Sequence, residues 1–143
     1  MMEPRELVAF AEAAVDQVEP IFRSGLGAQP ARFKGQGDFA TEVDLVIEQQ
    51  LRDILTQMTG ISVYGEESGG SVLDTVWVVD PIDGTANYSA GNPLAGILVA
   101  LIHKGAPVVA VSDFPLLGRR LVTCDGSPLR SVGGPATGFG GGE

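Results

Sequence analysis

The run Leu94–Ile102 carries no polar side chain, and it constrains the fold more than any other part of the chain. It is far shorter than the ~20 apolar residues that a membrane-spanning helix needs. A strand with one face in water would alternate apolar and polar residues, so the run predicts a strand that is buried on both faces. We therefore expect a cover on each face of the sheet to which this strand belongs.

Two amphipathic helices are predicted before the strands. In residues 4–24 the apolar side chains recur at helical spacing. Residues 25–40 are rich in glycine and are predicted to be a loop. A second helix is expected to begin at Thr41, because Thr41 and Asp44 resemble a capping box, and to end at Gly60.

Helices followed by a run of strands predict an α+β fold, with two N-terminal helices packed on an antiparallel sheet. Short turns between the strands favour hairpins, and no crossover helix is seen between them. Two helices can cover only one face of the sheet, so we expect the other face to dimerise or to be covered by further chain. The predicted strands are 61–64, 76–80, 94–103, 106–113 and 119–124.

Composition excludes several classes of protein. The formal net charge of −9 argues against binding to nucleic acid or to an anionic membrane. The single cysteine excludes an internal disulfide, and the N-terminus lacks the pattern of a signal peptide, so we expect a cytoplasmic protein. Residues 1–130 are predicted to form one domain, and residues 131–143 a disordered, glycine-rich C-terminal tail.

Carboxylates gather around the end of one predicted strand. The buried strand 76–80 ends at Asp80, Asp83 follows three residues later, and Glu66 and Glu67 lie on a preceding turn. Carboxylate oxygens are the ligands that Mg²⁺ prefers. The alternative is structural, since Asp-Pro and Asp-Gly pairs often only form turns.

Gly84 and Thr85 come directly after these acids. Their backbone N–H groups could receive a phosphate oxygen. Metal-binding carboxylates beside anion-binding amides indicate metal-assisted attack on a phosphate ester.

Three segments resemble the inositol monophosphatase family of Mg²⁺-dependent, lithium-sensitive phosphatases. Gly65–Ser68 and Trp77–Tyr88 resemble its first signature, and Lys34–Asp44 resembles the stretch before its second helix. The likeness covers most of residues 5–125. It implies a phosphoric monoester hydrolase with Mg²⁺ as cofactor, a small phosphorylated metabolite as substrate and a homodimer as the assembly.

The resemblance also assigns roles to single residues. It implies catalytic roles for Thr85, Asp44 and Glu66, with the Thr85 hydroxyl bonded to both the attacking water and Asp44. It implies that Gly84 and Thr85 bind the phosphate. The implied metal ligands are Glu66, Asp80, Asp83 and the backbone carbonyl of Ile82.

Three charged residues at or near the implied site, Asp44, Glu67 and Lys34, have more than one interpretation. Asp44 could only cap its helix, and both roles can coexist because a carboxylate has several lone pairs. Glu67 is expected near the metal ligands or at the surface, although a twisted turn would exchange it with Glu66. Lys34 lies in a glycine-rich loop that resembles a mobile, metal-associated segment of the family, but a solvated surface lysine is the favoured interpretation.

The family's second signature, which contains a Trp-Asp pair, is not matched, because Trp77 is the only tryptophan. The resemblance is therefore to the N-terminal half. The expected reaction is Mg²⁺-dependent hydrolysis of a small phosphate monoester, foremost inositol monophosphate, by a metal-activated water, with little activity for this chain alone. Histidinol phosphate, a sugar bisphosphate and a phosphoadenosine nucleotide are alternative substrates. A non-catalytic, truncated remnant or interaction module is the alternative of another class.

Overall fold

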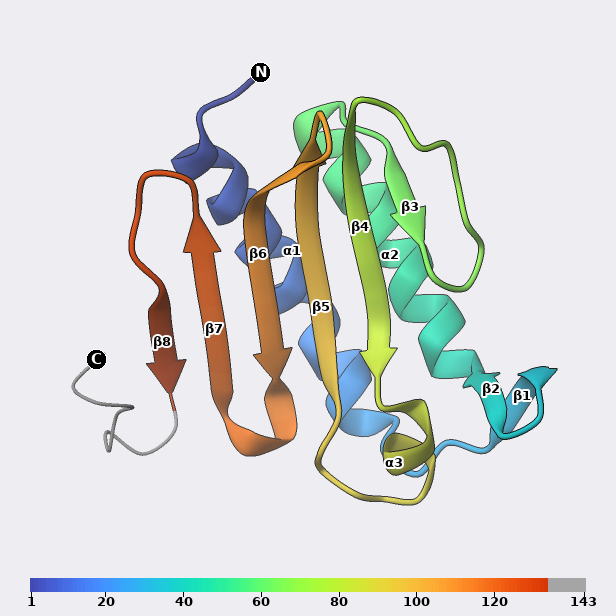
Figure 1. Ribbon diagram of the computed structural model, residues 1–143. Helices are drawn as coiled ribbons and strands as arrows, with labels where there is room; N and C mark the ends of the chain where they lie inside the picture. Colours follow the sequence, from blue (N-terminus) through green and yellow to red (C-terminus); the bar gives the residue numbers. More distant parts are fainter. Residues whose placement is uncertain (134–143) are drawn as a thin grey trace.

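The computed structural model describes residues 1–133, which form a sheet and a pair of helices over one of its faces (Figure 1). The six-stranded sheet has the order β3-β4-β5-β6-β7-β8. All neighbouring pairs are antiparallel except β3 and β4, which are parallel. The expected α+β fold is confirmed, with this one departure from an antiparallel sheet. The strands are β3 (Val63–Gly65), β4 (Thr75–Asp83), β5 (Gly96–His103), β6 (Ala106–Phe114), β7 (Arg119–Cys124) and β8 (Arg130–Gly133).

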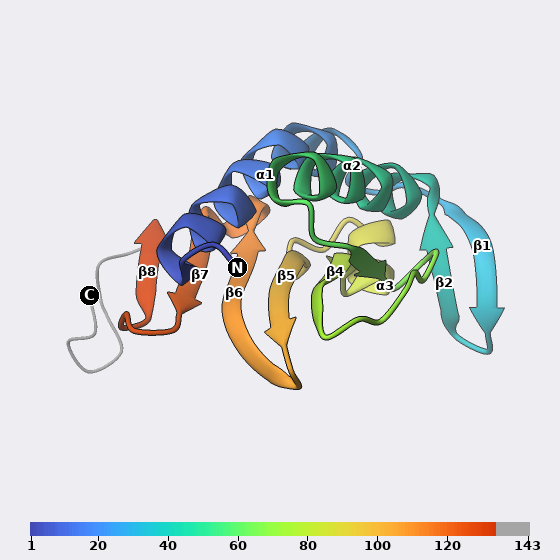
Figure 2. The same ribbon diagram turned by 90° about the horizontal axis from the view of Figure 1, so that it is seen from above.

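Helices α1 (Pro4–Ser24) and α2 (Glu42–Thr59) lie side by side on the same face of the sheet (Figure 2). Their bounds agree with the predicted ones. Thr41 and Asp44 form the expected capping box, and Gly60 ends α2 in the left-handed conformation that glycine adopts readily. Within residues 1–133 no helix combines the length and the apolar character that a bilayer crossing requires.

One hydrophobic core fills the space between the helices and the sheet. Each large apolar side chain buried there contributes about 1.5–3 kcal/mol relative to exposure to water. The indole Nε1 of Trp77 donates a hydrogen bond to Thr59 Oγ1 at 3.0 Å and ties β4 to the end of α2. The main contributors to the core are Leu7, Val15, Phe22, Ile47, Leu51, Leu55, Trp77, Ile97, Val99 and Leu101.

A hairpin occupies part of the segment 25–40, which was expected to be a loop. Strand β1 (Pro30–Gly35) pairs with β2 (Asp38–Thr41), and Gly37 in the turn between them has a φ of +75°. The hairpin projects beyond the sheet, and β2 packs beside the short helix α3 (Thr85–Ser89) (Figure 1). The prediction missed it because the side chains of β1 are almost all exposed and give no burial pattern.

Strand β8 crosses the boundary that the sequence suggested between a domain of residues 1–130 and a tail of residues 131–143. It pairs with β7 up to Gly133. The rest of the expected tail lies outside the described residues. A 3-10 turn, η1 (Pro115–Leu117), joins β6 to β7.

The end of β4 contains an irregularity that positions the candidate site. Asp80 pairs with Leu98 of β5, whereas Asp83 pairs with Gly96, so β4 carries one extra residue here. Such a bulge bends the strand and re-aims its side chains, and the proline after Asp80 fits it because proline lacks an N–H group. As a result the Ile82 side chain turns into the core, where it is 1% exposed.

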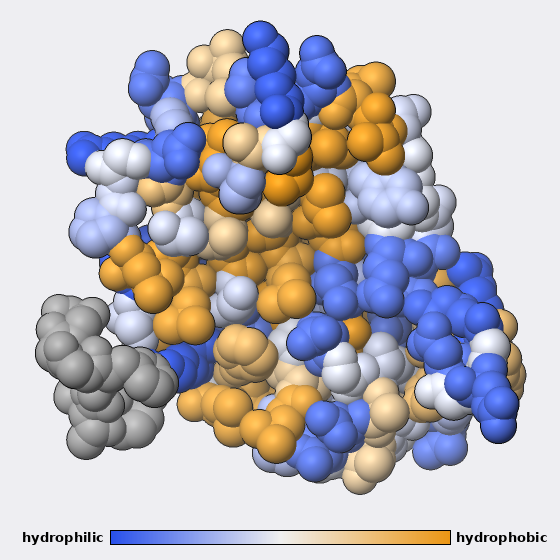
Figure 3. Space-filling view, in the orientation of Figure 1, coloured by the Kyte–Doolittle hydropathy of each residue, from blue (hydrophilic) through white to orange (hydrophobic). Residues whose placement is uncertain are grey.

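The two faces of β5 differ, so the expectation that Leu94–Ile102 is buried on both faces is wrong for the described residues. The side chains that face the helices are fully buried: Ile97, Val99 and Leu101. Those on the opposite face are only partly buried: Leu98, Ala100 and Ile102. Apolar side chains gather over the centre of this second face (Figure 3). A hollow of about 550 Å³ lies on this face, lined mainly by apolar side chains such as Leu98, Ala100, Tyr64, Val78 and Ala110, and also by the acids Glu66 and Asp80.

Arg120 of β7 is ion-paired with four carboxylates, and the three that lie on α1 connect the sheet to that helix. Its guanidinium lies 3.0 Å from Asp113 on β6 and 3.3, 2.7 and 3.1 Å from Glu12, Asp16 and Glu19 on α1. Only 11% of the Arg120 side chain is exposed, so the solvent screens these pairs less than it screens surface pairs.

Candidate functional site

A hollow of about 220 Å³ opens at the end of β4. The bulge of β4, the turn after β3, the start of α3 and the tip of the β1–β2 hairpin form its walls. Six residues that the sequence singled out line it: Glu66, Asp80, Ile82, Asp83, Gly84 and Thr85. The structure thus brings together every predicted metal and phosphate residue, and Asp44 lies directly behind Thr85.

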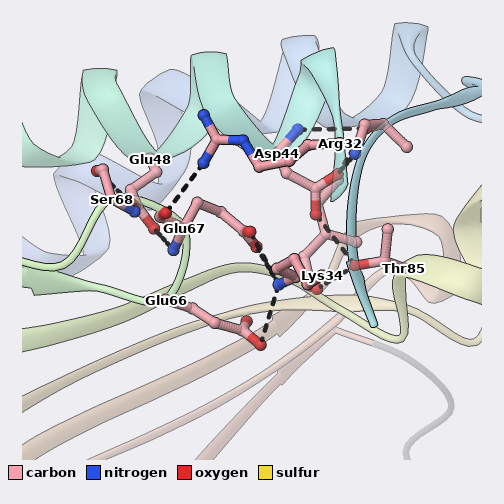
Figure 4. A network of polar contacts seen from close by, with 10 residues as sticks. Arg32, Lys34, Asp44, Glu48, Glu66, Glu67, Ser68 and Thr85 are labelled. Carbon is pink, nitrogen blue, oxygen red and sulfur yellow. Dashed lines mark hydrogen bonds and ion pairs between the residues drawn. The ribbon is translucent and has the colours of Figure 1, made fainter. Parts of the chain in front are cut away.

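Thr85 and Asp44 are hydrogen-bonded, as the resemblance implied. The Thr85 hydroxyl lies 3.0 Å from Asp44 Oδ2 and 3.0 Å from the carbonyl oxygen of Ile82 (Figure 4). The other oxygen of Asp44 accepts hydrogen bonds from the Thr41 backbone N–H at 2.6 Å and the Thr41 hydroxyl at 2.5 Å. Asp44 therefore caps α2 with one oxygen and faces Thr85 with the other.

Asp80 is a half-buried carboxyl of the hollow. Burial, with the neighbouring carboxylates of Glu66 and Asp83, raises the pKa of Asp80 to about 8. Its Oδ1 atom is buried and has no hydrogen-bond donor among residues 1–133. A buried oxygen without a donor, surrounded by other carboxylates, fits a divalent cation.

The donor set of the hollow consists of oxygen atoms only, as Mg²⁺ prefers. In residues 1–133 no three side chains of His, Cys, Asp or Glu are already close enough to hold an ion. Carboxylates repel one another at short range, so a positive charge is needed to draw them together. The Ile82 carbonyl belongs to the backbone of the bulge, and the Ile82 side chain is buried in the core.

The two adjacent glutamates have different surroundings. The Glu66 side chain is 49% exposed and lines the hollow, whereas the Glu67 side chain is 1% exposed and is not among the lining residues. Lys34 Nζ lies 2.9 Å from Glu67 and 3.8 Å from Glu66 (Figure 4). This arrangement favours Glu66 as the metal ligand over the exchanged alternative.

Lys34 is an exposed residue, as expected, but its ammonium group is ion-paired with both glutamates, and its side chain is 23% exposed. Burial alone would lower the pKa of Lys34, but the hydrogen bond to Glu67 and the nearby negative charges raise it. For the Glu67 carboxyl, burial outweighs the lysine and raises its pKa. The β1–β2 hairpin is thereby held over the turn that carries Glu66.

Sequence reasoning gave no metal, phosphate or catalytic role to the four other residues of the hollow: Gly37, Asp38, Phe39 and Ala86. The first three lie at or beside the tip of the unpredicted hairpin. The pair Gln36-Gly37 was the available signal, because a glycine in a two-residue connection is typical of a hairpin turn.

Comparison with known proteins shows the family of the chain. The model of the inositol monophosphatase family matches residues 3–136. Inositol-1-monophosphatase ImpA of Mycolicibacterium smegmatis is 47% identical over 131 residues, which are 90% of this chain and 48% of that protein. Histidinol-phosphatase of Mycobacterium tuberculosis is 38% identical over 115 residues, 77% of this chain and 44% of that protein. The chain spans about half the length of the curated relatives it matches.

A solved structure shows the same fold. The Thermotoga maritima IMPase TM1415 superposes with a TM-score of 0.81 at 25% identity, and the match covers 86% of this chain and 50% of that one.

Proposed function

Because the chain belongs to the inositol monophosphatase family, we propose that its 220 Å³ hollow is the metal and phosphate site of a phosphatase. The proposed reaction is hydrolysis of a small phosphate monoester with Mg²⁺ as cofactor. One observation carries the proposal: the Thr85 hydroxyl, bonded to Asp44, opens onto a hollow lined by Glu66, Asp80 and Asp83.

The chain's own residues suit this chemistry. The ion would be held by the carboxylates of Glu66, Asp80 and Asp83 and by the Ile82 carbonyl. When bound, Mg²⁺ offsets the charge of the phosphate oxygens and lowers the pKa of a nearby water.

Thr85 has one proton to donate. If it donates to Asp44, its lone pairs accept a hydrogen bond from the attacking water and orient it. The Asp44 acceptor is itself fixed by Thr41. The backbone N–H groups of Gly84 and Thr85 would hold phosphate oxygens.

Inositol monophosphate is the first proposed substrate. The likeness to a histidinol-phosphatase keeps histidinol phosphate as the second. The groups that line the hollow would contact the metal and the phosphate, and none of the described ones is assigned to the alcohol. We propose a homodimer in the cytoplasm, and both of these remain predictions.

Binding of inorganic phosphate, the common product, tests the proposal whichever alcohol is the substrate. Phosphate should bind to the chain in the presence of Mg²⁺ and only weakly in its absence, as followed by ³¹P NMR. Asp83→Asn should weaken the metal-dependent part, while Asp53→Asn, on the exposed side of α2, should not. Phosphate binding that is the same with and without Mg²⁺ contradicts the proposal.

A further inference from the structure

Glu48 is a buried acid that does not line the 220 Å³ hollow. It lies on α2, is 1% exposed and is one of four buried polar residues of the described chain. A buried carboxylate is costly unless hydrogen bonds compensate its desolvation. Its surroundings therefore show what the side chain is used for.

Within residues 1–133, the Glu48 carboxylate accepts its three hydrogen bonds from one loop. Oε1 accepts from the backbone N–H of Glu67 at 2.8 Å, and Oε2 accepts from the backbone N–H of Ser68 at 2.7 Å. Oε2 also accepts from the Ser68 hydroxyl (Figure 4). Two adjacent backbone donors are thus held by the two oxygens of one side chain.

This loop carries Glu66. Gly65 and Gly69 close it through two mutual backbone hydrogen bonds of 2.9 and 2.8 Å, so Glu66, Glu67 and Ser68 form a three-residue tip. The Glu66 backbone N–H donates to Val79 O at 3.1 Å, next to Asp80 on β4. The N–H groups of Glu67 and Ser68 donate to Glu48 on α2, and the Glu66 side chain lines the hollow.

Glu48 can approach the loop this closely only because residue 65 is a glycine. A Cβ atom at Gly65 would lie 2.2–2.5 Å from the carboxylate atoms of Glu48. One turn further along α2, the Arg52 guanidinium lies 3.7 Å from Glu48 and donates to the same loop, to Gly69 O at 2.8 Å and to the Ser68 hydroxyl at 3.1 Å. It also donates to Val63 O on β3 at 2.6 Å. The loop is therefore fixed by α2 at several points.

We propose that Glu48 is a positioning residue for the metal site: it holds the Gly65–Gly69 loop so that Glu66 faces Asp80. This inference rests on the proposed function, because it assumes that Glu66 binds the ion. Groups that orient a metal ligand from behind typically change metal affinity by about 10- to 100-fold when they are replaced.

The test uses the full chain and two readouts. In Glu48→Gln, one acceptor oxygen becomes a donor that faces backbone N–H groups. We expect Mg²⁺ and Mn²⁺ affinity, measured by calorimetry, to fall about 10- to 100-fold. We also expect faster amide hydrogen exchange at Glu67 and Ser68. The matched control is Leu55→Ala, a core change on the same helix, which should lower the melting temperature but leave metal affinity within about twofold.

The outcomes are distinguishable. If wild type binds the ions and a folded Glu48→Gln binds them equally well, the inference is wrong and the proposed function stands. If wild type binds neither ion, the proposed function fails and the inference fails with it. If Glu48→Gln does not fold, Ser68→Ala changes an exposed residue and removes one of the three hydrogen bonds to Glu48, together with the one from Arg52. It should weaken binding by a few-fold, and unchanged binding there overturns the inference.

Discussion

The hydroxyl of Thr85 lies 3.0 Å from Asp44 Oδ2, although the two residues are 41 positions apart in the chain. The contact joins the start of α3 to the start of α2, directly beside the bulge of β4. An acid that caps one helix thus also faces the first residue of another. Asp44 therefore has two roles: it caps α2, and it accepts the hydrogen bond of the proposed catalytic Thr85 hydroxyl.

Loss of the Thr85 hydroxyl should impair the reaction and spare the metal site. In any form of the protein with measurable turnover, Thr85→Ala should lower kcat by about 100-fold or more, because the attacking water loses its oriented acceptor. Metal affinity by calorimetry should stay within about twofold of wild type. Thr85→Ser keeps the hydroxyl and is the control. A Thr85→Ala enzyme with unchanged kcat would exclude the proposed role.

The sequence predicted those parts of the molecule whose local chemistry decides the structure. The bounds of α1 and α2 followed from helical spacing and from the cap at Thr41, and the site followed from the acids around β4. Exposed strands were missed, because β1 and β8 bury few side chains and show no alternation. Glu48 was missed for the opposite reason: a glutamate on a helix suggests a solvated face, and only the fold shows that a loop covers it.

The hydroxyl of Tyr88 should stabilise the junction of α3 and α1. It donates to the Phe22 carbonyl at 2.7 Å in the buried core, and the two rings are in contact at 4.8 Å. Tyr88→Phe leaves that carbonyl without a partner and should lower the free energy of unfolding by about 1–3 kcal/mol in urea. Tyr64→Phe, at a site that is 38% exposed, should change it by less than about 0.5 kcal/mol.

Asp113 should make stability fall as the pH rises. Burial, with a hydrogen bond to Glu19, raises its pKa from 3.8 to about 7, although Arg120 opposes the shift. Between these values the folded state keeps a proton that the unfolded state releases. This contribution is therefore complete below about pH 4 and is lost as the pH rises through 7.

The measurement compares wild type with Asp113→Asn in urea at pH 5 and pH 8, with a chelator present. The stability of wild type relative to the variant should be greater at pH 5 than at pH 8. Equal differences at the two pH values would show that Asp113 titrates normally.

The open face of the sheet should promote association. An exposed apolar surface of this kind is a typical site of dimerisation or aggregation. Sedimentation at several concentrations should reveal dimers or larger species, and Leu98→Gln, in the 550 Å³ hollow, should shift them towards monomer. Val72→Gln, in the loop before β4, is the control, because Val72 is 73% exposed and outside the hollow. A single monomeric species that binds no apolar dye would contradict the prediction.

Calorimetric titration of Mg²⁺ into wild type, Asp80→Asn and Asp74→Asn tests the central claim most directly. Asp80 presents a buried oxygen without a donor to the hollow, whereas Asp74 is an exposed residue just before β4. Wild type and Asp74→Asn should give the same binding isotherm, and Asp80→Asn should lose most of the heat. Equal heats for Asp80→Asn and wild type would mean that the hollow at the end of β4 is not a metal site.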